Sequence, residues 1–148
     1  MFIPDTFEVP ESVTLGDFRL RMLSIDDLEE DYRAVMESVE DLQGVFGERD
    51  KWPEPGLDKR QDLIDLGWHE KEFQIRSSFA YVVEDAGSQK YLGCIYIFPS
   101  PSNDCDAEVY GWLRSTEYSK QRQQELKKLV RFWLQSWPFE KICFPGTF

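Results

Sequence analysis

The sequence has few of the residues that mark exported, membrane-bound or metal-binding proteins. It contains one histidine and three widely spaced cysteines, Cys94, Cys105 and Cys143, with no CxxC pair, so neither a disulfide framework nor a zinc site is predicted. The first residues, MFIPDTFEVPE, carry acids and prolines where a secretory signal needs a basic patch and an apolar run. The longest apolar stretch, near Tyr91 to Phe98, is far shorter than the roughly 18–20 residues of a membrane span. We therefore expect a cytoplasmic protein without a membrane partner.

Positive charge is also scarce. The chain has 17 Lys and Arg against 28 Asp and Glu, a formal net charge of −11, which argues against nucleic acid as a partner because phosphate contacts need a basic surface. A neutral or cationic ligand fits this charge better. The sequence is rich in apolar residues: 41% of its 148 residues are hydrophobic and 15% are aromatic. This composition excludes a disordered chain and suits one domain with a sizeable core.

The hydrophobic periodicity predicts an N-terminal arm over residues 1–17 and a single domain over residues 18–148. Prolines and a glycine interrupt the arm, and Ser24 begins the first helix with a capping-box-like spacing to Asp27. On this helix we expect an apolar stripe facing inward and an acidic face, which includes Asp31, facing solvent. The predicted elements are strands over 18–23, 79–84, 91–98, 107–114 and 141–144, and helices over 24–42, 58–76 and 119–136. Their order, β-α-α-β-β-β-α-β, predicts an α+β fold with a mixed central sheet covered by helices on its faces.

Three segments in this order resemble the GNAT superfamily of acyl-CoA-dependent N-acyltransferases. They are FRLRMLSIDD (18–27), YLGCIYIF (91–98) and AEVYGWLR (107–114). The resemblance implies a GNAT-like fold in which the 107–114 strand diverges from its neighbour and the acyl-pantetheine arm of CoA lies in the opening. It implies acetyl-CoA as cosubstrate and a small-molecule or peptide amine as acceptor, with a homodimer possible. The alternative is a GNAT-like module that binds a ligand or partner without catalysis.

The family's pyrophosphate motif, [Q/R]-x-x-G-x-[G/A], falls on residues 119–124, where Arg122 and Gln124 replace the small residues. The resemblance also stops at Phe148, before a further helix and two strands that relatives usually have. Residues 114–131 contain six basic and two acidic side chains, so side-chain charge could hold a polyphosphate where the backbone cradle is weak. The alternative is that these charges form the solvated face of an amphipathic helix. The cofactor-binding candidates are Leu113, Arg114, Ser119, Lys120, Arg122 and Gln124.

The candidate catalytic residues are Glu108 and Tyr110, on the strand where a general base is commonly found in similar enzymes. Period-two alternation puts Trp112 on the same face, so these side chains could line one pocket wall. An exposed strand glutamate is the alternative for Glu108. The candidate substrate-binding residues, Phe46, Glu48 and Trp52, lie in a loop that borders the acceptor site in similar folds, although a hydrophobic plug would explain the aromatic pair equally well. His69 is expected on a helix surface beside Glu70, and no metal site is expected.

Overall fold

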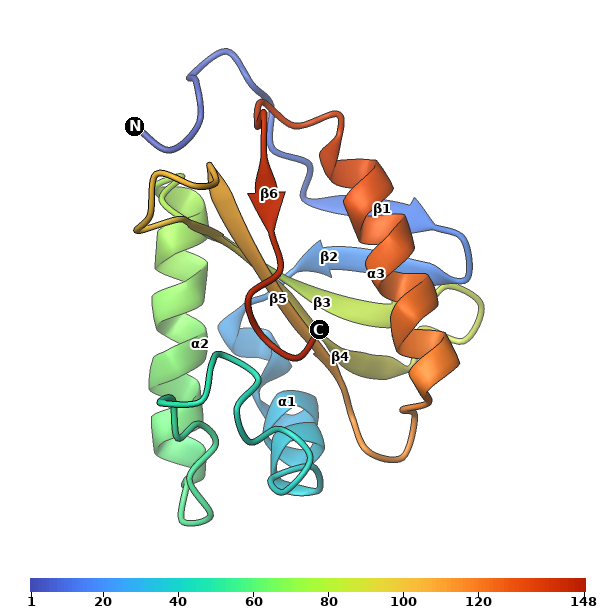
Figure 1. Cartoon of the computed structure of the whole chain (residues 1–148). Coiled ribbons are helices and arrows are strands. Elements are labelled where there is room, and N and C mark those ends of the chain that lie inside the picture. Colours follow the sequence, from blue (N-terminus) through green and yellow to red (C-terminus); the bar gives the residue numbers. More distant parts are fainter.

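The computed structural model describes all 148 residues and is built on one six-stranded sheet (Figure 1). Its strands lie in chain order, and each neighbouring pair is antiparallel except β5 and β6, which are parallel. The strands are β1 (Ser12–Leu15), β2 (Phe18–Met22), β3 (Phe79–Asp85), β4 (Tyr91–Pro99), β5 (Ala107–Leu113) and β6 (Ile142–Cys143). The predicted mixed sheet and the predicted order of elements are confirmed, with β1 added before them.

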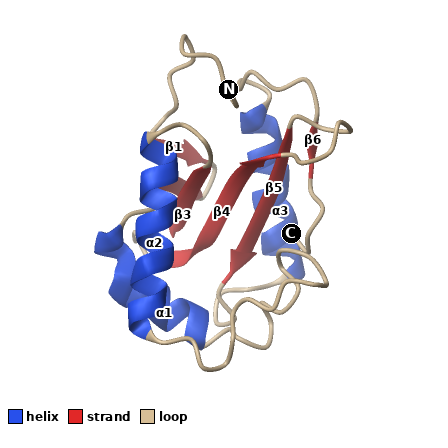
Figure 2. Ribbon diagram, turned by 90° about the vertical axis from the view of Figure 1, so that its left-hand side faces the viewer, coloured by secondary structure: helices blue, strands red, loops and turns tan.

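Helices cover both faces of the sheet (Figure 2). A short 3-10 turn (Ile25–Asp27) leads into α1 (Leu28–Met36), which lies with α2 (Lys59–Gln74) on one face, while α3 (Lys120–Leu134) crosses the other. The first helix is shorter than predicted, because its last turn is replaced by tertiary contacts. Glu37 pairs with Arg114, and the Ser38 hydroxyl accepts a hydrogen bond from the backbone N–H of Ser115. No helix is long and apolar enough to cross a bilayer.

Alternation along the central strands, shifted once where the pairing of β3 with β4 is irregular, sorts their side chains between two cores. On the α3 face, β5 contributes Ala107, Val109 and Leu113 to a core completed by Trp133 and its neighbours on α3. On the α1/α2 face, β4 contributes Tyr91, Cys94 and Tyr96, and β5 contributes Trp112 with Tyr110 packed beside it. The prediction that Tyr110 and Trp112 share one face of their strand is confirmed.

Residues 1–17 differ from the predicted arm. Residues 12–15 form β1, which pairs with β2 through a turn where Gly16 adopts a φ of 57°. The preceding residues are held too, since Ile3 is buried and the Tyr81 hydroxyl donates a hydrogen bond of 2.7 Å to the carbonyl of Pro10. The prolines prevent helix formation here without preventing packing.

The prediction that the cysteines are unpaired is wrong for two of them. Cys105 and Cys143, 38 residues apart, form a disulfide, while Cys94 is free and buried. The parallel pairing of β6 with the start of β5 brings Cys143 opposite Glu108, close to the loop that carries Cys105. Sequence spacing contains no information about this long-range pairing.

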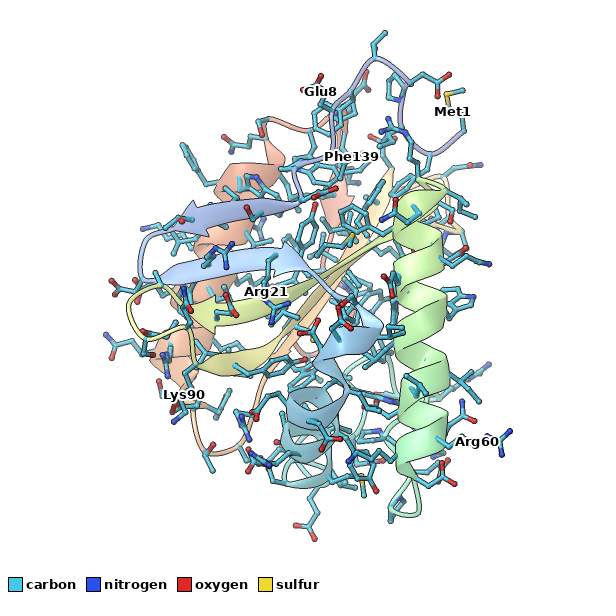
Figure 3. The ribbon with its side chains drawn as sticks, turned by 180° about the vertical axis from the view of Figure 1, so that it is seen from behind. Met1, Glu8, Arg21, Arg60, Lys90 and Phe139 are labelled. Atoms are coloured by element: carbon cyan, nitrogen blue, oxygen red, sulfur yellow. A yellow bond between two sulfur atoms is a disulfide. The ribbon has the colours of Figure 1, made fainter.

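The start of the helical segment is fixed by an ion-pair network around Arg21, which lies at the centre of the face seen in Figure 3. The Arg21 guanidinium donates to both carboxylate oxygens of Asp27, at 2.8 and 3.1 Å, and to Glu84 at 2.9 Å. Asp27 also completes a capping box with Ser24, as the sequence predicts. This network connects β2 and β3 to the entrance of α1.

We expect Gly93→Ala to destabilise the protein by about 1–3 kcal/mol, the usual cost of inserting a methyl group into packed space. A Cβ at Gly93 would lie 1.9 Å from the carbonyl oxygen of Trp112, so β4 and β5 would have to separate. The matched control is Gly56→Ala, because a Cβ at Gly56 has no neighbour within 4 Å. Urea unfolding of both variants measures the difference, and equal midpoints would contradict the close approach of the two strands.

Candidate active site

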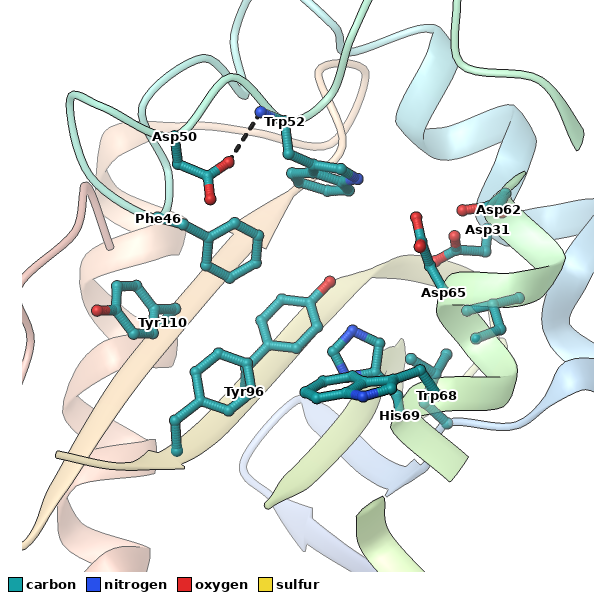
Figure 4. A pocket seen from close by; sticks show the side chains of 13 residues that line it. Asp31, Phe46, Asp50, Trp52, Asp62, Asp65, Trp68, His69, Tyr96 and Tyr110 are labelled. Carbon is teal, nitrogen blue, oxygen red and sulfur yellow. Dashed lines mark hydrogen bonds between the residues drawn. The ribbon is translucent and has the colours of Figure 1, made fainter. Parts of the chain in front are cut away.

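A cavity of about 360 Å³ opens on the α1/α2 face of the sheet (Figure 4). Its walls come from α1, α2, the loop between them, and the facing side chains of β4 and β5. The lining residues are Leu23, Asp31, Phe46, Asp50, Trp52, Asp62, Asp65, Leu66, Trp68, His69, Tyr96, Phe98 and Tyr110. Aromatic rings and carboxylates therefore dominate the wall, a combination that suits an organic cation.

Phe46 is the centre of the aromatic wall. Its ring centroid lies 5.1 Å from that of Tyr96 and 5.3 Å from those of Trp52 and Tyr110. The Trp52 backbone N–H donates to an Asp50 carboxylate oxygen at 2.8 Å, which fixes the loop over the cavity. Of the three substrate-binding candidates, Phe46 and Trp52 lie on the wall, whereas Glu48 is exposed and outside it. Asp50 is the acidic residue of this loop that lines the cavity.

The opposite end of the cavity is acidic. Asp31 of α1 and Asp62 of α2 are only 3% and 2% exposed, and Asp65 lies one turn further along α2. One oxygen of Asp31 accepts a hydrogen bond of 2.5 Å from the Tyr91 hydroxyl, and Asp62 Oδ2 has no hydrogen-bond partner. Burial raises the pKa of Asp31, and burial together with the neighbouring Asp31 charge raises the pKa of Asp62 to about 9. The pair therefore holds a proton near neutral pH.

The predictions that Asp31 and His69 face solvent are wrong. His69 lines the cavity, its ring centroid lies 5.2 Å from that of Tyr96, and its Nδ1 is buried without a partner. Burial lowers the pKa of His69 to about 4, so the imidazole is neutral at pH 7. Helical spacing contains a signal for this position, because His69 follows the buried Leu66 by three residues and precedes the buried Phe73 by four.

Glu108 and Tyr110 lie at the β5 wall and are joined to each other. The Tyr110 hydroxyl donates a hydrogen bond of 2.7 Å to one Glu108 oxygen, and the Ser100 hydroxyl donates to the other at 3.3 Å. Tyr110 lines the cavity, whereas Glu108 is behind it and half-buried. Burial and the Glu108 carboxylate raise the pKa of Tyr110, which keeps its hydroxyl protonated and able to donate. A proton could move between the cavity and Glu108 through this hydroxyl.

The cofactor-binding candidates lie at the end of β5 and at the start of α3, and most are engaged within the protein. Arg114 is buried, pairs with Glu37 and donates to the carbonyl of Tyr91. Arg122 donates to the carbonyl of Glu117 and lies near the carboxylates of Glu117 and Asp85.

The remaining candidates differ in how much of their polar surface is available. Leu113 is a buried core residue, and the Ser119 hydroxyl caps α3 by accepting from the backbone N–H of Arg122. Lys120 and Gln124 are exposed. Of the six basic residues predicted over 114–131, Arg114 and Arg122 are ion-paired and the other four are not, and among the cofactor-binding candidates only Lys120 has an unpaired charge.

The groove between β5 and α3 is partly filled by the chain's own residues 144–148, which lie in front of β5 in Figure 1. A cavity of about 260 Å³ remains beside them, with Gly111, Gln123 and Thr147 in its lining. Phe148 is 5% exposed, its carbonyl accepts from Lys127 Nζ at 2.9 Å, and the carbonyl of Thr147 accepts from Gln123 Nε2 at 3.2 Å. A Cβ on Gly111 of β5 would lie 3.2 Å from the Phe148 ring. In this arrangement Thr147 and Phe148 occupy part of the groove next to β5. No group of three or more His, Cys, Asp or Glu side chains could hold a metal ion.

Comparison with solved structures assigns the fold. The chain has the GNAT fold, the architecture of acyl-CoA-dependent N-acyltransferases. It is similar to RimL, a ribosomal L7/L12 alpha-N-protein acetyltransferase solved with coenzyme A, with a TM-score of 0.68 and 12% identity over 84% of this chain and 67% of that one. It is similar to the acetyltransferase from Salmonella typhimurium that modifies the N-terminal serine of L7/L12, with a TM-score of 0.66 and 10% identity over 84% and 68%.

The microcin C7 self-immunity acetyltransferase MccE, solved with acetyl-CoA and AMP, is similar to the same extent, with a TM-score of 0.66 and 12% identity over 85% of this chain and 67% of that one. No family model and no curated protein sequence matches the chain. These neighbours are acetyltransferases, and at such low identity they establish the fold and leave the reaction to be argued from the site.

We expect the stability of the wild-type protein to fall as pH rises from 7 to 8.5, and to fall less in Asp62→Asn. The folded pKa of Asp62 is raised above its unfolded value, so in this window the folded state binds a proton that the unfolded state lacks. Such a proton contributes a loss of up to about 1.4 kcal/mol per pH unit. Urea unfolding at each pH measures the slope, and equal slopes in the two proteins would contradict a shared proton.

Proposed function

We propose that this protein is an N-acetyltransferase that transfers an acetyl group from acetyl-CoA to a cationic amine bound in the cavity. One observation carries the proposal: a GNAT-fold sheet has, on the α1/α2 side of β5, a cavity lined by aromatic rings and carboxylates. Carboxylates attract an ammonium group, and aromatic faces bind cations and the methylene groups next to them. The volume of about 360 Å³ suits a small-molecule amine or the end of a peptide.

The residues of β5 supply the proton transfer in this proposal. An amine becomes nucleophilic only when it is neutral, so the bound ammonium must first lose one proton. When the amide C–N bond forms, the C–S bond of acetyl-CoA breaks, and the second proton that leaves the nitrogen balances the departing CoA thiolate. Glu108 accepts a hydrogen bond from Tyr110, and Tyr110 is in contact with the cavity, so the hydroxyl can pass a proton from the amine to a Glu108 oxygen. Glu108 is then the general base and Tyr110 the group that relays the proton. Phe46 and Trp52 position the amine.

Donor binding in the groove between β5 and α3 displaces part of the segment over residues 144–148. Lys120 is then the one candidate whose charge is free to meet a phosphate, because Arg114 and Arg122 are paired within the protein. We derive no step of the reaction from this groove, since residues 144–148 occupy part of it.

A second candidate function is an amine-binding protein without catalysis. The partly filled groove favours it: Phe148 is buried there, and two side chains of α3 hold the carbonyls of residues 147 and 148. Calorimetric titration of acetyl-CoA, with and without an amine, separates the two candidates. Binding of acetyl-CoA supports the transferase. Amine binding in a protein that never binds acetyl-CoA supports the second candidate.

We expect Glu108→Gln to lower the rate of amine acetylation by about 10²–10⁴-fold, the usual contribution of general acid–base catalysis. The amide keeps the shape and still accepts from Tyr110 but cannot take up a proton. Steady-state kinetics with acetyl-CoA and an amine measure the loss. Glu48→Gln is the matched control, because Glu48 is exposed and outside the cavity. A full rate in Glu108→Gln would remove its assignment as the base.

We expect removal of Thr147 and Phe148 to strengthen acetyl-CoA binding by about tenfold or more, because these residues occupy the groove with a buried aromatic ring. Calorimetry measures the affinity, and circular dichroism checks that the shortened protein folds. Phe132→Ala is the control, since this α3 ring is 72% exposed and outside the groove. If the shortened, folded protein binds acetyl-CoA no better than wild type, residues 147 and 148 do not limit access.

A further inference from the structure

The acidic end of the cavity lacks a positive partner. None of the ion pairs in the protein includes Asp31, Asp62 or Asp65. Asp62 Oδ2 is buried, lines the cavity and receives no hydrogen bond. A buried carboxylate oxygen without a donor is costly, and it marks a place where the protein leaves room for a proton or a cation.

The groups packed around this pair do not neutralise it. From β4, the Tyr91 hydroxyl donates to Asp31, and the Cys94 thiol lies 3.8 Å from the same oxygen. From the 3-10 turn, Asp27 adds a further negative charge, although its oxygens are bound by Arg21 of β2. From α2, Asp65 accepts from Gln61 at 2.9 Å. The surroundings therefore supply two neutral donors and two more carboxylates, and the one cation among them, Arg21, is already paired with Asp27 and Glu84.

We propose that one ammonium group of a diamine binds between Asp31, Asp62 and Asp65, replaces the proton that the Asp31–Asp62 pair holds in the free protein, and places the second amino group at β5. This inference rests on the proposed function for the role of the second amino group. The binding of the first ammonium group is argued from the cavity alone and does not depend on the proposed function.

The proton balance follows from the charges. In the free protein at pH 7, Asp62 is protonated, because burial and the Asp31 charge raise its pKa to about 9. The ligand arrives already protonated, since a primary alkylamine, like the side chain of lysine, has a pKa above 10. Its N–H groups can donate to the oxygens that the proton had satisfied, so the pair ionises and about one proton passes to solvent for each ligand bound. No bond to carbon is made or broken in this step.

The shape of the cavity explains why a second amino group is needed. Figure 4 shows the three aspartates at one end, Tyr110 and Phe46 at the other, and Tyr96 between them. An ammonium held by Asp31 and Asp62 lies away from the Tyr110–Glu108 pair and cannot give its proton to it. A methylene chain lying along the Tyr96 and Phe46 rings would reach that pair with its far end. The substrate class is therefore an α,ω-diamine or a compound that presents two amines in the same way.

Calorimetric titration tests the ammonium site. The probes are 1,5-diaminopentane, pentylamine and 1-pentanol, each titrated at pH 7 in phosphate and in Tris, whose ionisation enthalpies differ. We expect both amines to bind with release of about one proton, which is measured as a difference in binding heat between the two buffers. We expect the alcohol to bind at least about 30-fold more weakly than the amines. Binding of the amines without a buffer-dependent heat, or equal binding of the alcohol, would overturn the proposal.

Variants of the pair sharpen the test. Asp62→Asn keeps the size of the side chain but cannot ionise, so we expect proton release to disappear and the affinity for both amines to fall about 30-fold or more. Asp65→Asn, which changes a less buried member of the cluster, should weaken binding while retaining proton release. Asp26→Asn is the control for net charge, because Asp26 is exposed and outside the cavity. Unchanged binding in Asp62→Asn, or a loss in Asp26→Asn as large as in Asp62→Asn, would overturn the assignment.

Acetylation assays separate this inference from the proposed function. We expect kcat/KM for 1,5-diaminopentane to exceed that for pentylamine by about tenfold or more, because pentylamine places its only amine at the acidic end. Acetylation of both amines at equal rates would overturn the diamine assignment and leave the transferase intact. Proton-linked amine binding without any acetylation would overturn the transferase and leave the ammonium site intact.

Discussion

The burial of Asp31 is the constraint on which the cavity depends. This carboxylate belongs to α1, accepts a hydrogen bond from Tyr91 of β4 and lies beside Asp62 of α2, so it connects both helices to the sheet. An apolar residue at this position would let α2 pack directly against β4 and would close the acidic end. A charged residue without partners would be expelled toward solvent. The pair is therefore retained at a cost in stability, and the open space beside it is the result.

Strand β5 separates the two halves of the candidate site. Glu108 and Tyr110 face the cavity side, while Gly111 and its apolar neighbours face α3 and the segment over residues 144–148. Because successive side chains of a strand point to opposite faces, one strand can present polar side chains to one side and a glycine, which lets another segment approach the backbone closely, to the other. The residues on one face of β5 can therefore be substituted without changing those on the other face. Here the cavity side of β5 presents Glu108 and Tyr110, whereas the groove side is in contact with Phe148.

Local patterns in the sequence predict the elements well. The alternating or continuous apolar runs give β3, β4 and β5 to within one residue at each end, and the capping box at Ser24 marks the start of the helical segment. The face shared by Tyr110 and Trp112 also follows from alternation alone. These features depend on neighbours a few residues apart, which is the range over which sequence periodicity carries information.

The site itself depends on contacts between distant residues, and there the sequence is less informative. Asp31 follows Leu28 by three residues and precedes Val35 by four, so it lies on the inner stripe of α1, but its charge favours a surface assignment. Arg114 and Arg122 look like phosphate ligands by charge and position. Their partners Glu37 and Asp85 come from other elements, which no local pattern identifies.

The same is true of the Cys105–Cys143 disulfide and of Phe148 against Gly111. Each joins residues more than 35 positions apart, and each is decided by how the strands pair and not by the spacing of the residues along the chain. Such contacts can be identified only from the tertiary structure.

The positions of the five tryptophans give the protein a natural optical probe. Trp52 and Trp68 line the cavity, and Trp112 lies beneath Trp52 with ring centroids 6.2 Å apart. Trp133 and Trp137 are buried in the core on the α3 face, on the far side of the sheet. A molecule entering the cavity changes the polarity around the first group and leaves the second group as an internal reference. Intrinsic fluorescence therefore reports occupancy of this pocket in the unmodified protein, without a dye or an engineered label.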